Sequence, residues 1–187
     1  MRHILAAFAS VIVFASCAHA QTSSTAPATP PPPPPNCSAA EHHALDFWIG
    51  EWDAYRADNN RLSGRSSITA SDGGCVINEH WTSIGQPFPY SGRSLNLYES
   101  TAHRWEEYWS DSTGSRVYFV GSAIAAGAVQ MSTPSPSPTG PNSAMQWQRV
   151  TFTPNADGTV TQQGDTSPDG QTWTLNYRLI YRHHQGN

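Results

Sequence analysis

Alternating apolar and polar positions dominate the chain from residue 37 onward, and a period of two is typical of β-strands with one buried face. Turn-forming pairs such as Asp157-Gly158 and Asp169-Gly170 separate the alternating segments at intervals of roughly 8–12 residues, which is typical of a sandwich or barrel. The pattern predicts ten strands, at residues 45–55, 62–70, 75–84, 93–99, 104–111, 115–122, 127–132, 145–154, 158–166 and 171–182.

Short connections between these strands favour antiparallel hairpins in an up-and-down meander. The exception is residues 133–143, which carry four prolines and are expected to form a loop. Residues 38–46 favour a short helix, because Ser38 and Glu41 have the spacing of a capping box. Closure into a barrel removes the exposed edges of a meander. We therefore expect an all-β fold, an antiparallel up-and-down β-barrel of about ten strands over residues 37–187.

Three of the predicted strands carry an ionisable residue beside a tryptophan on one face, because side chains two apart along a strand point the same way. The strands are 75–84, 104–111 and 145–154. Their shared faces hold Cys75, Ile77, Glu79 and Trp81; Trp105, Glu107, Trp109 and Asp111; and Met145, Trp147, Arg149, Thr151 and Thr153.

If the tryptophans turn inward, Glu79, Glu107 and Arg149 turn inward with them. Burying a charge costs several kcal/mol unless the charge is paired, so we favour a polar-lined cavity that holds water or a ligand. Two alternatives stay open: Arg149 pairs with Glu107 in a solid core, or these faces point outward at a dimer interface. The candidate ligand-binding residues are Glu79, Trp81, Asn96, Tyr98, Glu107, Trp109 and Arg149.

Gly50-Glu51-Trp52 resembles the Gly-x-Trp signature of lipocalins and related calycin barrels. The resemblance implies that Trp52 plugs the closed end of the barrel beneath an arginine of the last strand, for which Arg178 or Arg182 is the candidate. More widely, the chain is similar to a family of small secreted bacterial proteins of unknown function, which implies a lipocalin-like barrel and no established activity. The motifs that carry this similarity are Phe47 to Asp53, Gly74 to Trp81, Asn96 to Tyr98, Trp105 to Trp109 and Ser167 to Trp173.

Residues 1–20 have the pattern of a signal peptide, with a basic start, an apolar run and a small-residue cleavage site that ends at Ala20. We therefore expect export to the periplasm or the medium and a mature protein that begins at Gln21. The alternative is a lipoprotein anchored at Cys17, although Phe14 is unusual at the first position of a lipobox. Residues 21–36 include six consecutive prolines and predict an extended linker.

Two cysteines remain once Cys17 is removed or lipidated, and in an oxidising compartment Cys37 and Cys75 are expected to form a disulfide. The eight histidines include adjacent pairs, whose members point to opposite faces of a strand and cannot chelate together. No zinc-binding pattern or serine nucleophile elbow occurs, so we expect no metal and no cofactor.

Composition narrows the function further. The net charge is −4, there is no lysine, and only 13% of residues are charged, which argues against nucleic acid as a partner. We favour an exported binding protein for a small, partly apolar ligand with an anionic group held by Arg149. The first alternative is a lyase or isomerase with Glu79 or Glu107 as acid and base, Tyr98 as donor and Arg149 as anion clamp. The second is an interaction or structural protein of the cell envelope.

Overall fold

The computed structural model describes residues 37–139 and 144–186, so the predicted signal peptide, the proline-rich linker and Cys17 lie outside the described residues. The strands are β1 (Gly50–Arg56), β2 (Leu62–Ser71), β3 (Val76–Ser83), β4 (Ser91–Glu99), β5 (Arg104–Asp111), β6 (Arg116–Ala123), β7 (Val129–Ser132), β8 (Ser137–Pro138), β9 (Met145–Pro154), β10 (Val160–Ser167) and β11 (Thr174–His183). The 3₁₀ helices are η1 (Ala40–His43), η2 (Asp46–Trp48), η3 (Asp72–Gly74) and η4 (Ala125–Gly127).

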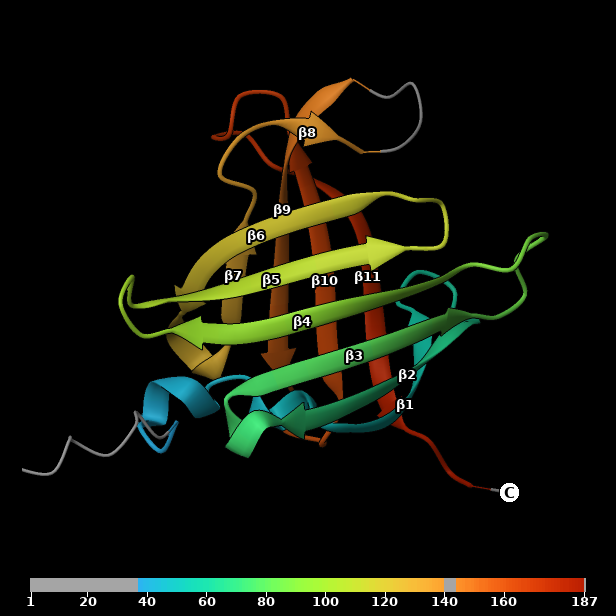
Figure 1. Cartoon of the computed structure of the whole chain (residues 1–187). Coiled ribbons are helices and arrows are strands. Elements are labelled where there is room, and N and C mark those ends of the chain that lie inside the picture. The colour runs from blue at the N-terminus through green and yellow to red at the C-terminus, as the bar shows by residue number, and fades with distance from the viewer. Residues whose placement is uncertain (1–36, 140–143, 187) are drawn as a thin grey trace, which may run out of the picture. The chain divides into compact units, whose positions relative to one another are not determined.

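Ten of these strands close into an antiparallel barrel, which confirms the expected fold class. Strands β1 to β7 pair in sequence order, β7 pairs with β9, and β9, β10 and β11 lead back to β1. The short strand β8 pairs only with β9 and stands outside the barrel. Figure 1 shows β3 to β6 crossing in front of β9 to β11, so these two groups form opposite walls.

The strands agree closely with the ten predicted segments, with two differences. The predicted first strand begins too early, because residues 46–48 form η2 and bury Trp48 completely. The predicted loop 133–143 contains β8, whose Ser137 and Pro138 pair with the start of β9. No helix in the described part of the chain is long and apolar enough to cross a membrane.

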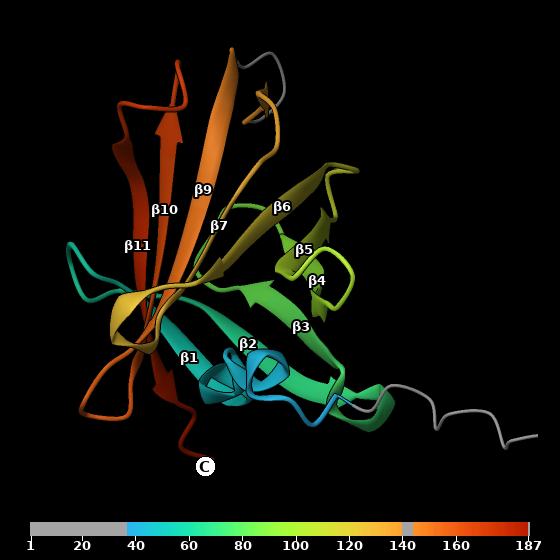
Figure 2. The same cartoon turned by 90° about the vertical axis from the view of Figure 1, so that its left-hand side faces the viewer.

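The N-terminal 3₁₀ helices cover one end of the barrel (Figure 2). Trp48 packs there against Phe152 at 4.4 Å between ring centroids. Trp52 is buried and donates a hydrogen bond from Nε1 to the Trp48 carbonyl oxygen at 2.8 Å. The predicted disulfide between Cys37 and Cys75 is present and ties the segment before η1 to the start of β3. This end of the barrel is therefore closed.

The arginine expected to cover Trp52 is not there, and this prediction was wrong. His183 stacks on Trp52 instead, with ring centroids 4.0 Å apart and an interplanar angle of 22°. Arg178 and Arg182 alternate with the inward-facing Tyr181 along β11, so both point to the outer surface. His183 reaches Trp52 because these two residues are direct cross-strand partners.

Aromatic rings lie over glycines at the opposite end of the barrel. Each ring occupies the space that a Cβ atom of the neighbouring strand would need, and each glycine leaves that space free. The pairs are Trp81 over Gly64, Trp109 over Gly92 and Tyr177 over Gly164. These rings form an aromatic layer between the interior of the barrel and the loops at this end.

Candidate functional site

Two carboxyl groups lie inside the barrel between its closed end and the aromatic layer. Glu79 of β3 and Glu107 of β5 keep only 3% and 4% of their surface exposed. Both face inward because they share the strand face of a buried tryptophan or isoleucine, as the alternating pattern predicts. The interior is therefore acidic at its centre.

Glu79 accepts hydrogen bonds from side chains of three other strands. Ser66 Oγ donates to Oε1 at 2.6 Å, Ser94 Oγ donates to Oε2 at 3.4 Å, and the Tyr181 hydroxyl lies 3.5 Å from Oε1. Burial raises the pKa of Glu79 to about 7, although these three hydrogen bonds act in the opposite direction. This carboxyl group is thus held in place and close to its titration midpoint at neutral pH.

Glu107 differs from Glu79, because its Oε2 atom is buried and has no hydrogen-bond partner. Burial and then the charge of Glu79 raise the pKa of Glu107 to about 8. Its cross-strand partner on β4 is Asn96, which is completely buried and whose Oδ1 atom also lacks a partner. The Asn96 amide group donates to Ser94 Oγ at 2.7 Å and to the Ile77 carbonyl oxygen at 3.2 Å, so its orientation is fixed.

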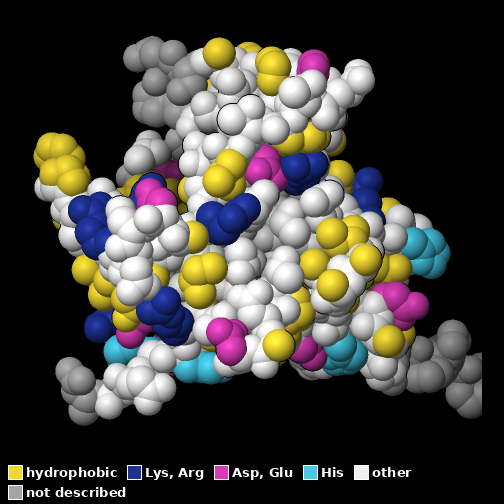
Figure 3. Space-filling model, turned by 180° about the vertical axis from the view of Figure 1, so that it is seen from behind, with side chains coloured by type: hydrophobic (Ala, Val, Ile, Leu, Met, Phe, Trp, Pro, Cys, Tyr) yellow, Lys and Arg dark blue, Asp and Glu magenta, His cyan; other side chains and the backbone are white. Residues whose placement is uncertain are grey.

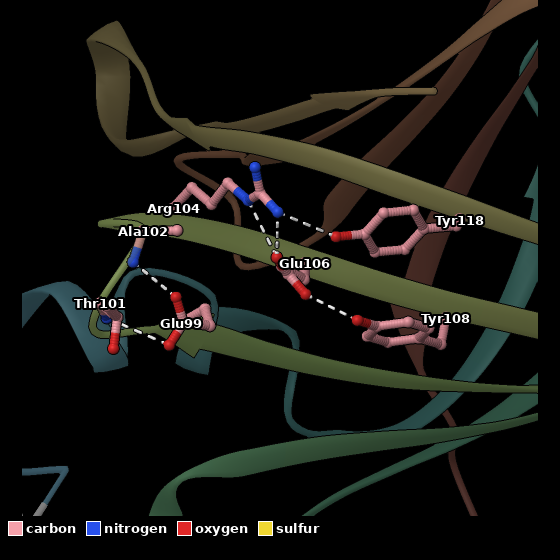
Figure 4. A network of polar contacts seen from close by, with 7 residues as sticks. All are labelled: Glu99, Thr101, Ala102, Arg104, Glu106, Tyr108 and Tyr118. Atoms are coloured by element: carbon pink, nitrogen blue, oxygen red, sulfur yellow. Dashed lines mark hydrogen bonds and ion pairs between the residues drawn. The ribbon is translucent and has the colours of Figure 1, made fainter. Parts of the chain in front are cut away.

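The preceding residue, Glu106, is also buried, but both of its carboxyl oxygens have hydrogen-bond partners. Glu106 points to the outer face of the same strand, where Arg104 and Tyr108 donate to its two oxygens at 2.6 and 2.7 Å (Figure 4). Burial alone would raise the pKa of Glu106, but the hydrogen bonds from Tyr108 and Arg104 outweigh it and lower the pKa. Glu106 and Glu107 thus differ in their partners: both oxygens of Glu106 accept hydrogen bonds, whereas Oε2 of Glu107 has no partner.

Arg149 does not line the interior, and its predicted position was wrong. Val150 and Phe152 are the buried residues of β9, which places Arg149 on the outer face. Its guanidinium donates to Asp165 Oδ2 from Nη2 at 3.0 Å and lies 4.2 Å from the centre of the Trp173 ring. The loop between β10 and β11 covers this part of the outer surface, and Arg149 is half-buried beneath it.

The other predicted residues lie on the inner wall at different heights. Trp81 and Trp109 belong to the aromatic layer, and Trp109 Nε1 donates to Asp111 Oδ2 at 3.4 Å. Tyr98 lies nearer the closed end, where its ring meets the buried His42 edge-on at 5.1 Å. The structure therefore brings Glu79, Asn96 and Glu107 together and places Tyr98 one step nearer the closed end, as the cross-strand partner of Trp105.

A hollow of about 400 Å³ opens outside Trp81. Tyr90 and Phe88 contribute to its wall, and Phe88 is 79% exposed. Trp81 itself is 8% exposed and also contacts Tyr181 across the barrel, with ring centroids 6.4 Å apart. Trp81 thus stands between this hollow and Glu79, which lies two residues before it on the same strand.

Sequence reasoning missed three residues that complete the polar wall: Ser66, Gln162 and Tyr181. Tyr181 is buried and donates to Gln162 Oε1 at 2.8 Å, next to its contact with Glu79. Their signal was weak, because serine and glutamine on an alternating strand are expected on the solvent side. The strand pairing that places Tyr181 inside the barrel could not be predicted from the sequence. Tyr181 is the cross-strand partner of both Ala54 and Val160, and both of these residues are buried.

The interior contains groups that can form hydrogen bonds, but the described residues place no lysine or arginine side chain there. The chain contains no lysine, and none of the arginines in the described residues is buried. No group of three or more His, Cys, Asp or Glu side chains that could hold a metal ion exists within residues 37–139 and 144–186. Trp105 Nε1, a donor two residues before Glu107 on the same face of β5, is also buried without a partner. The arrangement therefore suits a small uncharged or cationic group that can form hydrogen bonds.

No protein-family model matches the chain, and a search of curated proteins found no match either. The closed antiparallel barrel is consistent with the lipocalin-like architecture that Gly50-Glu51-Trp52 implies.

Proposed function

We propose that the protein is an exported binding protein that holds a small molecule inside its barrel, against Glu79, Asn96 and Glu107. The observation that carries the proposal is the pair of buried oxygens without partners, Glu107 Oε2 and Asn96 Oδ1, on neighbouring strands. Leaving a buried acceptor unsatisfied costs about 1–3 kcal/mol. A ligand that forms hydrogen bonds with both atoms would remove that cost, which gives the site a driving force for binding.

The chemistry of the wall defines the ligand class. Asn96 Oδ1 calls for an N–H or O–H donor, whereas Glu107, with a pKa raised to about 8, keeps its proton at neutral pH and can both donate and accept. Two carboxyl groups without a nearby arginine disfavour an anion. We therefore replace the anionic ligand predicted from Arg149 with a neutral or cationic one that carries at least one hydrogen-bond donor. The aromatic layer supplies flat apolar surface for the rest of the molecule.

The hollow outside Trp81 is the proposed entrance. It leads from solvent to the Trp81 ring, and the exposed Phe88 beside it offers apolar surface to an approaching ligand. Movement of the Trp81 ring away from Gly64 would connect the hollow with Glu79. Replacing Trp81 by alanine should therefore speed both uptake and release of the ligand.

Native mass spectrometry of the protein, purified from cells that export it, tests the proposal. We expect wild-type protein and the control Glu41→Gln, at an exposed position, to retain a small molecule that Glu107→Leu loses. A thermal-shift screen of small amines, amides and polyols covers the case of a ligand lost during purification. Retention that is equal in Glu107→Leu, or the absence of both an adduct and a stabilising compound, would refute the proposal.

One observation favours an enzyme as the second candidate. Carboxyl groups with pKa values of about 7 and 8 can both give and take protons near neutral pH. The predicted role of Arg149 as anion clamp finds no support, because Arg149 lies on the outer face with Asp165. The predicted role of Tyr98 as donor is left without a hydrogen bond to either carboxyl group in the described residues. An acid–base enzyme would exchange a C–H hydrogen of the retained molecule for deuterium in D₂O, whereas a binding protein would not.

A further inference from the structure

A second hollow, of about 440 Å³, lies on the outer surface of the barrel. Strands β1, β9, β10 and β11 form its floor with residues that alternate with the inward-facing ones, so the barrel wall separates it from the interior site. Figure 3 views the molecule from this side, where arginine groups stand among uncharged side chains and some of them lie next to acidic groups. The hollow is lined by Arg56, Ala57, Asn60, Thr153, Thr161, Gln163, Arg178, Ile180 and Arg182.

Two of its three arginines are fixed by neutral oxygens rather than by carboxylates. Arg178 donates from Nε and Nη2 to Gln163 Oε1 at 3.0 and 2.6 Å. Arg182 lies over the Tyr55 ring at 4.5 Å and donates from Nη2 to Asn60 Oδ1 at 2.8 Å. Amide oxygens orient a guanidinium group without cancelling its charge.

The side chain of Gln163 is itself fixed in orientation by a hydrogen bond to Asp165. Its amide group donates to Asp165 Oδ1 at 2.9 Å, which turns its oxygen toward Arg178. Asp165 is buried and accepts from Arg149 through its other oxygen. The Arg178 guanidinium is therefore positioned by a chain of contacts that exists before any ligand arrives, and such preorganisation lowers the entropic cost of binding.

Acidic side chains surround the hollow but do not enter it, since none of its lining residues is Asp or Glu. Asp58 pairs with Arg56 at 2.9 Å, and Asp53, the cross-strand partner of Arg182, is engaged by Arg65 and His184. Asp157 accepts hydrogen bonds from Thr159, and these bonds together with the nearby charge of Arg182 lower the pKa of Asp157. Neither Arg178 nor Arg182 forms an ion pair with a carboxylate within the described residues, on a protein whose net charge is −4.

We propose that this arginine hollow binds an oxyanion of the phosphate class. The planar guanidinium groups of Arg178 and Arg182 can each donate two parallel hydrogen bonds to such a group. The Thr153 and Thr161 hydroxyls lie in the same wall and suit the remaining oxygens. The phosphate can belong to a free small molecule or to a lipid headgroup, and the chemistry of recognition is the same.

Calorimetric titration with inorganic phosphate and co-sedimentation with vesicles of phosphatidylglycerol, against phosphatidylcholine vesicles, separate the two sources. We expect binding in at least one arm. Arg178→Gln should weaken it about tenfold or more, as expected for a lost charge-assisted hydrogen bond, and Arg178→Gln/Arg182→Gln should abolish it. The matched control Arg93→Gln removes an exposed arginine on β4, outside the hollow, and should bind like wild type.

Circular dichroism of each variant shows whether the barrel remains folded, which is expected because both arginines are exposed. Two results would overturn the proposal. One is phosphate and anionic vesicles that bind no better than chloride and neutral vesicles at equal ionic strength. The other is equal weakening by Arg93→Gln and Arg178→Gln, which indicates a general charge effect.

Discussion

Glu107 shows at the scale of one residue how burial sets protonation. In the unfolded chain its pKa has the usual value of 4.5, and inside the barrel burial and Glu79 raise it to about 8. Between these values the unfolded state is ionised while the folded state keeps its proton. The stability that Glu107 contributes is therefore fully present below pH 4.5 and is lost as the pH rises toward 8.

Urea unfolding of wild type and Glu107→Gln across this pH range checks this. Glutamine resembles the protonated acid in shape and does not titrate. The stability of wild type relative to the variant should fall by about 1.4 kcal/mol per pH unit between the two pKa values. Glu41→Gln, at an exposed site, should run parallel to wild type. Parallel curves for Glu107→Gln would show that Glu107 is ionised in the fold.

Arg149 provides a second prediction at this scale, because its partner is the buried Asp165 and not Glu107. Arg149→Met should cost about 3–5 kcal/mol by leaving the Asp165 charge buried without its cation. Arg149→Met with Asp165→Leu should recover much of this loss. Arg149→Met with Glu107→Leu should be additive within about 0.5 kcal/mol, since the two residues share no contact. A double-mutant cycle that couples Arg149 to Glu107 would contradict the placement.

At the scale of strands, pairs of a glycine and an aromatic ring build the layer at the end of the barrel opposite η1 and η2. A Cβ atom on Gly92 would overlap the Trp109 ring, so Gly92→Ala must displace that ring or the strand. We expect a loss of about 1–3 kcal/mol in unfolding free energy, as overpacking typically costs. Gly186→Ala adds the same methyl group where no atom lies within 4 Å and should change stability little. Equal stability of both variants would mean that the layer is loosely packed.

The disulfide acts on the first elements of the barrel. It joins Cys37 to Cys75, 38 residues apart, and so restrains the segment that carries η1 and η2. Replacing both cysteines by serine should cost roughly 2–4 kcal/mol, because the unfolded chain regains the freedom of a long loop. Chemical denaturation of the oxidised protein and the double variant measures the difference. An unchanged midpoint would show that the closed end holds without the bridge.

Most strands could be predicted from the sequence because a period of two, interrupted by Asp-Gly turns, has few alternatives. The start of β1 could not be, since Leu45 and Trp48 are both completely buried although their spacing does not fit a strand. Leu45 and Trp48 reach the core from the 3₁₀ segment that covers the end of the barrel. The spacing of apolar residues along the chain does not show which end of a barrel such a segment covers.

At the scale of the whole molecule, the interior could be predicted only in part. Glu79 and Glu107 follow from alternation, because each shares its face with buried aromatic or aliphatic residues. The same argument fails for Arg149, since Trp147 on its face packs against Gly170 of the loop that follows the neighbouring strand β10, and not against the barrel core. A tryptophan therefore marks a buried face, but that face can be on the outside of a barrel.

The proposed binding site depends on this closed architecture. One end is sealed by η1 and η2, the other carries the aromatic layer, and the unsatisfied acceptors lie between them. A closed barrel of this size holds either packed side chains or one small ligand. Under the proposal the barrel belongs to the second kind, and its ligand satisfies the unpaired oxygens of Glu107 and Asn96.

The central claim is that a small molecule binds inside the barrel against Glu107 and Asn96. A crystal structure of the protein purified from cells that export it tests this claim most directly. We predict electron density for a small molecule within hydrogen-bond distance of both Glu107 Oε2 and Asn96 Oδ1, in contact with the aromatic layer. An interior packed with side chains alone, or one in which ordered water satisfies both oxygens and no other molecule is present, would contradict it.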